Sequence, residues 1–137
     1  MKKLIVLTAL FLFSGITFSQ TLEKGNLIGF HTLTINVNPD VTFNQYMDLF
    51  MNKYVPKYEE SFPGLKLYVV KGIRGKDENS FGLLFMFDSV ETRDKYWPKM
   101  GESSELAQQY FDKLRPTTDE LQKLGSWSSI HTDWVVQ

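Results

Sequence analysis

The stretch Phe81 to Phe87, FGLLFMF, decides the fold of this chain. Successive side chains of a β-strand point to opposite faces of the sheet. One face of this stretch therefore carries Phe81, Leu83, Phe85 and Phe87, and the other carries Leu84 and Met86. Because both sets are apolar, the pattern predicts a strand that is buried on both of its faces.

Two strands and a helix are predicted on the N-terminal side of this stretch. Leu27 to Val37 and Leu65 to Ile73 are rich in β-branched and apolar residues, as strands are. Between them, Thr42 is suited to cap a helix whose apolar residues recur every three or four positions. Pro56 falls inside that helix and predicts a kink or a break near Lys53.

The C-terminal side adds helices and one more strand. Helices are predicted after Ser89, around residues 106–114, and from Thr117, which starts a capping-box spacing. Ser128 to Val136 is predicted as the last strand. The order β-α-β-β-α-β is that of the ferredoxin-like α+β fold, with a four-stranded antiparallel sheet and here an extra helix in the second crossover.

The other strands are also apolar on both faces. In the first strand, Leu33 and Ile35 oppose Ile28 and Phe30. The helices of one domain cover only one face of such a sheet, and soluble monomers rarely expose a large apolar patch. We therefore predict a homodimer in which a second copy covers the open face. The alternative is a monomer whose own long side chains and loops cover that face.

The composition indicates one domain and excludes several classes of protein. The chain has 137 residues, of which 42% are hydrophobic, so intrinsic disorder is excluded. The 15 Lys and Arg residues nearly balance the 16 Asp and Glu residues, so no nucleic-acid partner is expected on electrostatic grounds. The absence of cysteine excludes disulfides, thiolate zinc sites and cysteine nucleophiles.

The first residues have the pattern of a secretory signal peptide. Lys2 and Lys3 precede the apolar run Leu4 to Phe13, and small residues follow it. We predict a signal peptide over residues 1–19, cleavage between Ser19 and Gln20, and one domain over residues 20–137. The protein is then periplasmic or secreted, without a membrane anchor after cleavage. The alternative is an uncleaved anchor, but the apolar run is shorter than the roughly 20 residues that span a bilayer.

Several segments resemble the dimeric α/β-barrel superfamily, which includes the antibiotic-biosynthesis-monooxygenase-like domains. The segments are Gly29-Phe30-His31, the stretch from Tyr54-Val55-Pro56 to Phe62-Pro63-Gly64-Leu65, Val70-Lys71-Gly72, the helix from Phe87-Asp88-Ser89 to Tyr96-Trp97, and Thr132-Asp133-Trp134. The resemblance implies a homodimer whose two sheets form a barrel, with a cavity in each protomer. Members of the superfamily include cofactor-independent oxygenases, haem-handling proteins and stress proteins. The haem degraders resemble one another in using an Asn, a His and a Trp together, but these three do not align with this chain residue by residue, so they are not transferred to it.

The two histidines are the main candidates for chemistry. His31 lies in the first strand and His131 in the last, and these strands are antiparallel neighbours in a ferredoxin-like sheet. Together with Asp133 they suit acid–base work or a divalent metal if they converge. Matching the apolar faces of the two strands, however, predicts that the histidines point opposite ways. His31, placed among aliphatic residues, is then the better site candidate, and the alternative is a structural histidine.

Aromatic residues with polar tips are the other candidates. Tyr68, Trp97 and Trp134 lie near strand ends or crossovers, and each offers a flat face and one hydrogen-bond donor to a planar ligand. The alternative is ordinary packing in the core or the dimer interface. No metal site is predicted and no cofactor is required, although haem with His31 as axial ligand is left open.

Three functions follow from these observations. The first is the binding of a small apolar or aromatic ligand in a cavity near His31. The second is an enzyme, either a cofactor-independent monooxygenase or a haem-handling protein. The third is a non-catalytic structural or stress-related dimer. The sequence leaves the question of enzymatic activity open.

Overall fold

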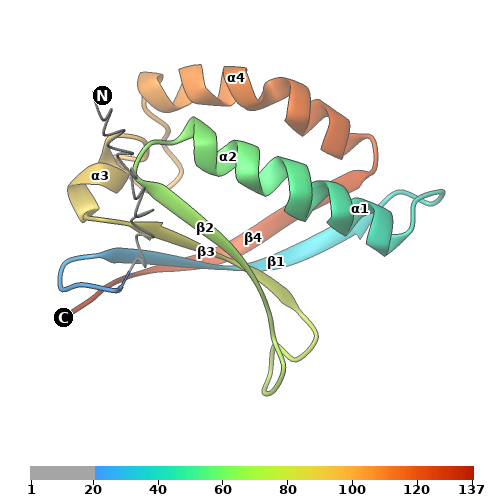
Figure 1. Cartoon of the computed structure of the whole chain (residues 1–137), viewed down its shortest axis with the longest axis horizontal. Helices are drawn as coiled ribbons and strands as arrows, with labels where there is room; N and C mark the ends of the chain where they lie inside the picture. Colours follow the sequence, from blue (N-terminus) through green and yellow to red (C-terminus); the bar gives the residue numbers. More distant parts are fainter. Residues whose placement is uncertain (1–20) are drawn as a thin grey trace, which may run out of the picture.

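The computed structural model describes residues 21–137, which form one antiparallel sheet with helices on one of its faces (Figure 1). The strands are β1 (Leu27–Val37), β2 (Leu65–Lys71), β3 (Phe81–Phe87) and β4 (Gly125–Val135), in the order β2-β3-β1-β4. This order and the helices between the strands confirm the ferredoxin-like α+β fold. The predicted signal peptide, residues 1–19, lies outside the described residues.

The first crossover is a helix with a π-helical turn in its middle. It consists of α1 (Phe43–Leu49), the π-helix η1 (Phe50–Tyr54) and α2 (Val55–Ser61). Thr42 caps α1 through a capping box with Gln45. The π-helical turn confirms the predicted irregularity near Lys53. It places Pro56 in the first turn of α2, where a missing backbone N–H is tolerated.

The second crossover contains the short helix α3 (Val90–Asp94) and the long helix α4 (Glu105–Gln122). The prediction that a new helix starts at Thr117 is wrong, because α4 continues through Pro116 and Thr117 without a break. The buried residues of α4 share one face across that point, and packing of this face holds the helix together. They are Ala107, Leu114, Thr117 and Leu121.

Three strand ends differ from the prediction. β2 ends at Lys71, before Ile73, and β4 begins at Gly125, before Ser128, and ends at Val135, before Val136. Gly125 pairs with Val37, and a Cβ at Gly125 would lie 2.4 Å from the backbone oxygen of Asn36. Glycine therefore allows the close approach that starts β4 directly after the preceding turn.

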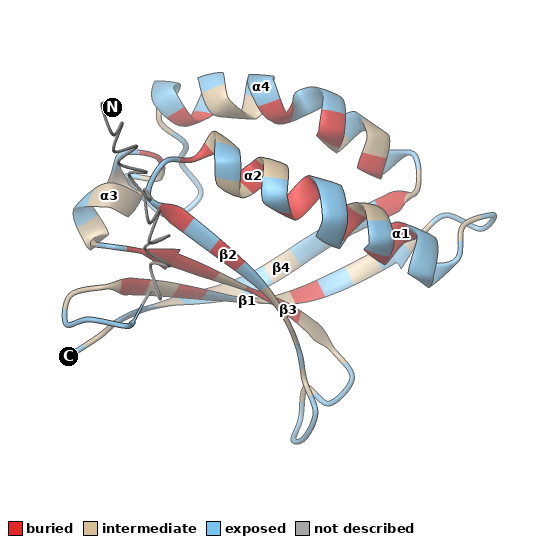
Figure 2. Cartoon of the chain, viewed as in Figure 1, coloured by how far each residue is buried: buried red, intermediate tan, exposed pale blue. Residues whose placement is uncertain are grey.

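The two faces of the sheet differ in what covers them. One face packs against α1, η1, α2 and α4, and its side chains form the core with residues such as Tyr46, Phe50 and Phe62. No helix of residues 21–137 lies on the other face (Figure 2). We call it the open face and define it by residues that alternate with the core residues. They are Ile28, Phe30, Thr32, Lys66, Tyr68, Val70, Gly82, Leu84, Met86, Ile130, Thr132 and Trp134.

The open face is apolar and partly exposed, as the alternation in the sequence predicts. Ile130 is 85% exposed, Trp134 63% and Tyr68 46%. Lys66 is the one charged residue in the set. Within residues 21–137, no helix combines the length and the apolar composition that a membrane crossing requires.

Candidate functional site

The residues of β4 that face the helices are mostly polar, and they line a cavity. Trp127, Ser129, His131 and Asp133 alternate with the outward-pointing residues of the strand. The cavity has a volume of about 660 Å³. Its other walls come from β1, β3, α2, α3 and the loop between α3 and α4. These walls are largely aromatic and apolar: Leu27, Tyr58, Phe85, Phe87, Trp97, Pro98 and Met100.

The two histidines lie side by side in this cavity, so the prediction that they point opposite ways is wrong. His31 and His131 are direct partners in the pairing of β1 with β4. Their rings stack with centroids 4.5 Å apart and planes 10° apart. The prediction failed because it matched apolar residues to the core, whereas Ile130 and Trp134 of β4 lie on the open face.

His31 is held between polar and aromatic partners. Its Nδ1 lies 3.1 Å from Ser129 Oγ, and its ring centroid lies 4.2 Å from that of Phe85. Burial, together with the neighbouring His131, lowers the pKa of His31 from 6.5 to about 4, and Asp133 opposes the shift. His31 is therefore an uncharged imidazole at neutral pH.

A small well opens above Gly29, next to the Nε2 atom of His31. Gly29 is paired with Asp133 of β4 on one side and with Phe85 of β3 on the other. A Cβ built on Gly29 would lie 3.0 Å from Asp133 Oδ1, 3.4 Å from His31 Nε2 and 3.5 Å from Phe85 Cβ. The side chains of Asp133, His31 and Phe85 thus surround a position, Gly29, that has no side chain. We call this space the Gly29 well.

An ion pair holds Asp133 in place. Arg93 of α3 donates from Nη1 to Asp133 Oδ2, and its Nε donates to Asp94 Oδ1 at 2.7 Å. Both Arg93 and Asp133 are about three-quarters buried, with side-chain exposures of 25% and 27%. Since Arg93 engages Oδ2, the Oδ1 atom remains at the Gly29 well.

Three of the five candidate residues line the cavity and two do not. His31, His131 and Trp97 lie together there. Tyr68 and Trp134 lie on the open face, so the structure separates them from the histidines. The reason is the two-residue period of a strand, which places neighbours of core residues on the opposite face.

Gly29 and Arg93 belong to the site but were not predicted from the sequence. A glycine inside an apolar strand is a known signal for a close approach of another group, and Gly29 carried that signal. Arg93 carried none, because an arginine in a short surface helix is ordinary. Its role follows only from the position of α3 at the end of β4.

The histidines do not form a metal site in this arrangement. Imidazole lone pairs lie in the ring plane, so two stacked parallel rings do not aim at one ion. Among the described residues, no group of three His, Cys, Asp or Glu side chains is placed to hold a metal. Haem on His31 also fits poorly, because Asp133 and Phe85 bound the space at Nε2 where a porphyrin would have to extend.

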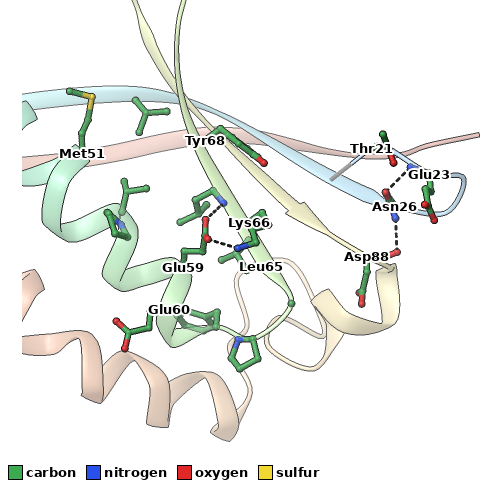
Figure 3. Close-up of a pocket in the computed structure, with 17 residues that line it drawn as sticks. Thr21, Glu23, Asn26, Met51, Glu59, Glu60, Leu65, Lys66, Tyr68 and Asp88 are labelled. Atoms are coloured by element: carbon green, nitrogen blue, oxygen red, sulfur yellow. Dashed lines mark hydrogen bonds and ion pairs between the residues drawn. The ribbon is translucent and has the colours of Figure 1, made fainter. Parts of the chain in front are cut away.

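A second, larger hollow of about 1080 Å³ runs along the outer edge of β2 beside α2 (Figure 3). Its central polar group is Glu59, which accepts the backbone N–H of Leu67 at 2.9 Å and Lys66 Nζ at 2.7 Å. These contacts occupy both carboxylate oxygens and protect the edge of the sheet. The hollow has no histidine, and we therefore place the candidate site in the smaller cavity.

Comparisons with known proteins find similarity of fold only. No protein-family model matches the chain, and no curated protein matches its sequence. The crystal structure of SnoaB, a cofactor-independent oxygenase from Streptomyces nogalater, is similar at 12% identity and a TM-score of 0.47, covering 82% of this chain and 94% of SnoaB. A dimeric protein of unknown function and ferredoxin-like fold from Bacteroides fragilis is similar at 11% identity and a TM-score of 0.38, covering 79% of this chain and 95% of that one. The sheet order by itself assigns the ferredoxin-like fold to this chain.

Proposed function

We propose that this protein binds a small, flat, largely apolar molecule in the cavity beside His31. The observation that carries the proposal is the division of the cavity into an aromatic part and a polar end. Tyr58, Trp97 and Trp127 supply flat apolar walls, and His31 and Asp133 lie at the polar end. Ligand sites commonly combine apolar walls with a few convergent polar groups.

Tryptophan fluorescence tests this proposal, because Trp97 and Trp127 line the cavity. A panel of two- and three-ring aromatic compounds should quench the emission with saturation. Replacing Trp97 by Leu should reduce the quenching, because only Trp127 then reports on the cavity, and replacing Trp134 on the open face should not. If no compound of the panel saturates the protein, the cavity is not a site for flat ligands.

A second function, proton abstraction from a weakly acidic ligand, is favoured by the protonation state of His31. Burial keeps this imidazole uncharged at neutral pH but also weakens it as a base, so proton transfer to it depends on the Asp133 carboxylate, whose charge stabilises the imidazolium. The ligand's O–H or C–H bond would break, the proton would move to Nε2, and the electron pair would stay on the ligand. Oxygen as the oxidant of the resulting anion would make the protein a cofactor-independent oxygenase. Oxygen uptake with phenolic compounds tests this, and its absence across the panel would reject the oxygenase.

We also propose that the protein acts as a homodimer paired through the open face. In the sheet register, one row across this face consists of Lys66, Met86, Ile28 and Trp134, and the next of Tyr68, Leu84, Phe30 and Thr132. A second copy presents the same largely apolar rows, so the face is self-complementary under two-fold symmetry. Sedimentation over a range of concentrations should show a dimer that dissociates on dilution, and a monomer throughout would reject this proposal.

Export of the protein is proposed from the sequence alone. The positively charged start and the short apolar run before Gln20 support it. N-terminal sequencing of protein produced from the full chain should find Gln20 as the first residue. A start at Met1 on soluble intracellular protein would reject it.

A further inference from the structure

We infer that the Gly29 well selects ligands that place a hydrogen-bond donor, such as a ring hydroxyl or amino group, next to His31 and Asp133, and that it rejects ligand carboxylates. This inference rests on the proposed function, because the well forms part of the floor of the proposed ligand cavity. It adds the chemical class of the ligand's polar group and names the residues that choose it.

The two polar atoms at the well are acceptors. Asp133 Oδ1 is a carboxylate oxygen and accepts hydrogen bonds only. His31 Nδ1 lies 3.1 Å from Ser129 Oγ, and when Nδ1–H donates to that oxygen, Nε2 keeps its lone pair. A hydroxyl group satisfies one of these acceptors, and an amino group reaches both.

The charges around the well disfavour an anion. Of the two cations among the described residues that line the cavity, Arg93 already contacts Asp133 and Asp94, and Lys99 is exposed to solvent with its Nζ 3.6 Å from Glu102. A ligand carboxylate in the well would therefore face Asp133 without a buried, unpaired cation from this part of the chain to balance it. Buried like charges destabilise each other strongly, so such a ligand should bind weakly.

The absence of a side chain at Gly29 makes room for the donor. A Cβ at this position would lie only 3.0 Å from Asp133 Oδ1, so even one methyl group fills the space between the acceptors. The carboxylate is the end of a side chain and can shift by a few tenths of an ångström. We therefore expect Gly29→Ala to fold and to lose the well while the rest of the cavity stays.

Three matched ligands test the inference: naphthalene, 2-naphthol and 2-naphthoate. Their ring systems are equal, so only the polar group differs. In the wild-type protein, 2-naphthol should bind at least about tenfold more tightly than naphthalene, and 2-naphthoate should bind most weakly. In Gly29→Ala, 2-naphthol should bind no more tightly than naphthalene, whose own affinity should change little.

A charge variant and its matched control sharpen the test. Asp133→Asn removes the negative charge at the well. The ratio of the binding affinities of 2-naphthol and 2-naphthoate should then fall by about tenfold or more. Asp94→Asn makes the same change on the other carboxylate that pairs with Arg93, outside the cavity lining. It should leave the order of the three ligands unchanged.

The outcomes separate this inference from the proposed function. If naphthalene binds and 2-naphthol binds no better, or if Gly29→Ala weakens both ligands equally, the well does not select the ligand and the inference is overturned while the cavity stands. If Asp94→Asn changes the ligand order as Asp133→Asn does, the selection does not arise at the well. If none of the three ligands binds, the cavity is no aromatic site and both proposals fall.

Discussion

The two faces of β4 differ in a way that is the reverse of the usual pattern. The side that faces the helices carries Ser129, His131 and Asp133, and the side without helices carries Ile130 and Trp134. Polar residues turned inward are costly unless they are paired or used. Apolar residues turned outward mark a surface that another molecule covers. The comparison teaches that one strand supports both proposals, a ligand cavity on one face and an interface between two copies on the other.

The largest expected effect comes from charging the open face. Replacing Ile130 and Trp134 together by Lys places two like charges in each half of the proposed interface, where desolvated charges are strongly unfavourable. The dimer should dissociate at least about a hundredfold more readily, measured by sedimentation equilibrium. Ile73→Lys is the matched control, since Ile73 is 87% exposed but lies in the loop beyond β2. Equal dissociation in both variants would show that the dimer interface does not lie on the open face.

The next largest effect is expected on ligand affinity when His31, on the face toward the helices, is replaced. His31→Ala removes the imidazole that lies between His131 and Phe85, and aromatic ligand affinity should fall by about tenfold or more. Tyr68→Ala provides the comparison, because Tyr68 was also a candidate from the sequence but lies on the open face. Its ligand affinity should stay within about twofold of wild type. Isothermal titration with 2-naphthol measures both, and a larger loss in Tyr68→Ala would reverse the assignment of the faces.

A smaller effect is expected on the stability of the fold as the pH is lowered. The pKa of His31 is about 4 in the folded protein, below its ordinary value of 6.5, because of burial. The unfolded chain therefore binds more protons between these values, so stability is fully present above pH 6.5 and is lost as the pH falls toward 4. Allowing for the partial exposure of the ring, the loss attributable to His31 is about 1–2 kcal/mol.

Urea denaturation at about pH 7 and about pH 4.5 measures this loss. His31→Gln has no titrating group at this position and should lose less stability than wild type between the two conditions. If both proteins lose the same amount, His31 is not the group whose burial opposes protonation.

The smallest expected effect is on ligand affinity, and it is tested by comparing two adjacent serines. Ser129→Ala removes the hydroxyl beside His31 Nδ1 and should weaken ligand binding by roughly two- to fivefold, as expected for one neutral hydrogen bond. Ser128 precedes it on the opposite face, paired with Thr34, and Ser128→Ala should leave binding unchanged. The same loss in both variants would show that the side chain of Ser129 does not orient His31.

Much of the fold could be predicted from the sequence because the strands repeat apolar residues with a clear period. The bounds of β1 and β3 and the caps at Thr42 and Ser89 follow from local chemistry, and the structure confirms them. The break expected at Thr117 does not occur, because packing along one face of α4 outweighs a local capping signal.

The site was harder to predict because it depends on which face of β4 is inward. The rule that apolar residues face the core assigned His131 to the wrong side. The register of β1 with β4 settles the matter, because it pairs His31 with His131 directly. Arg93 and the Gly29 well depend on the position of α3 and of three separate strands, which no local pattern contains.

The three tryptophans of the chain allow one direct test of the central claim that the sheet binds a ligand on one face and a second copy on the other. Trp97 and Trp127 line the cavity, and Trp134 lies on the open face. With 5-fluorotryptophan incorporated, fluorine NMR gives one signal for each. Addition of 2-naphthol should shift the signals of Trp97 and Trp127 and leave that of Trp134 in place, and dilution through dimer dissociation should do the opposite. A ligand that moves the Trp134 signal alone, or a dilution that moves only the cavity signals, would contradict the account.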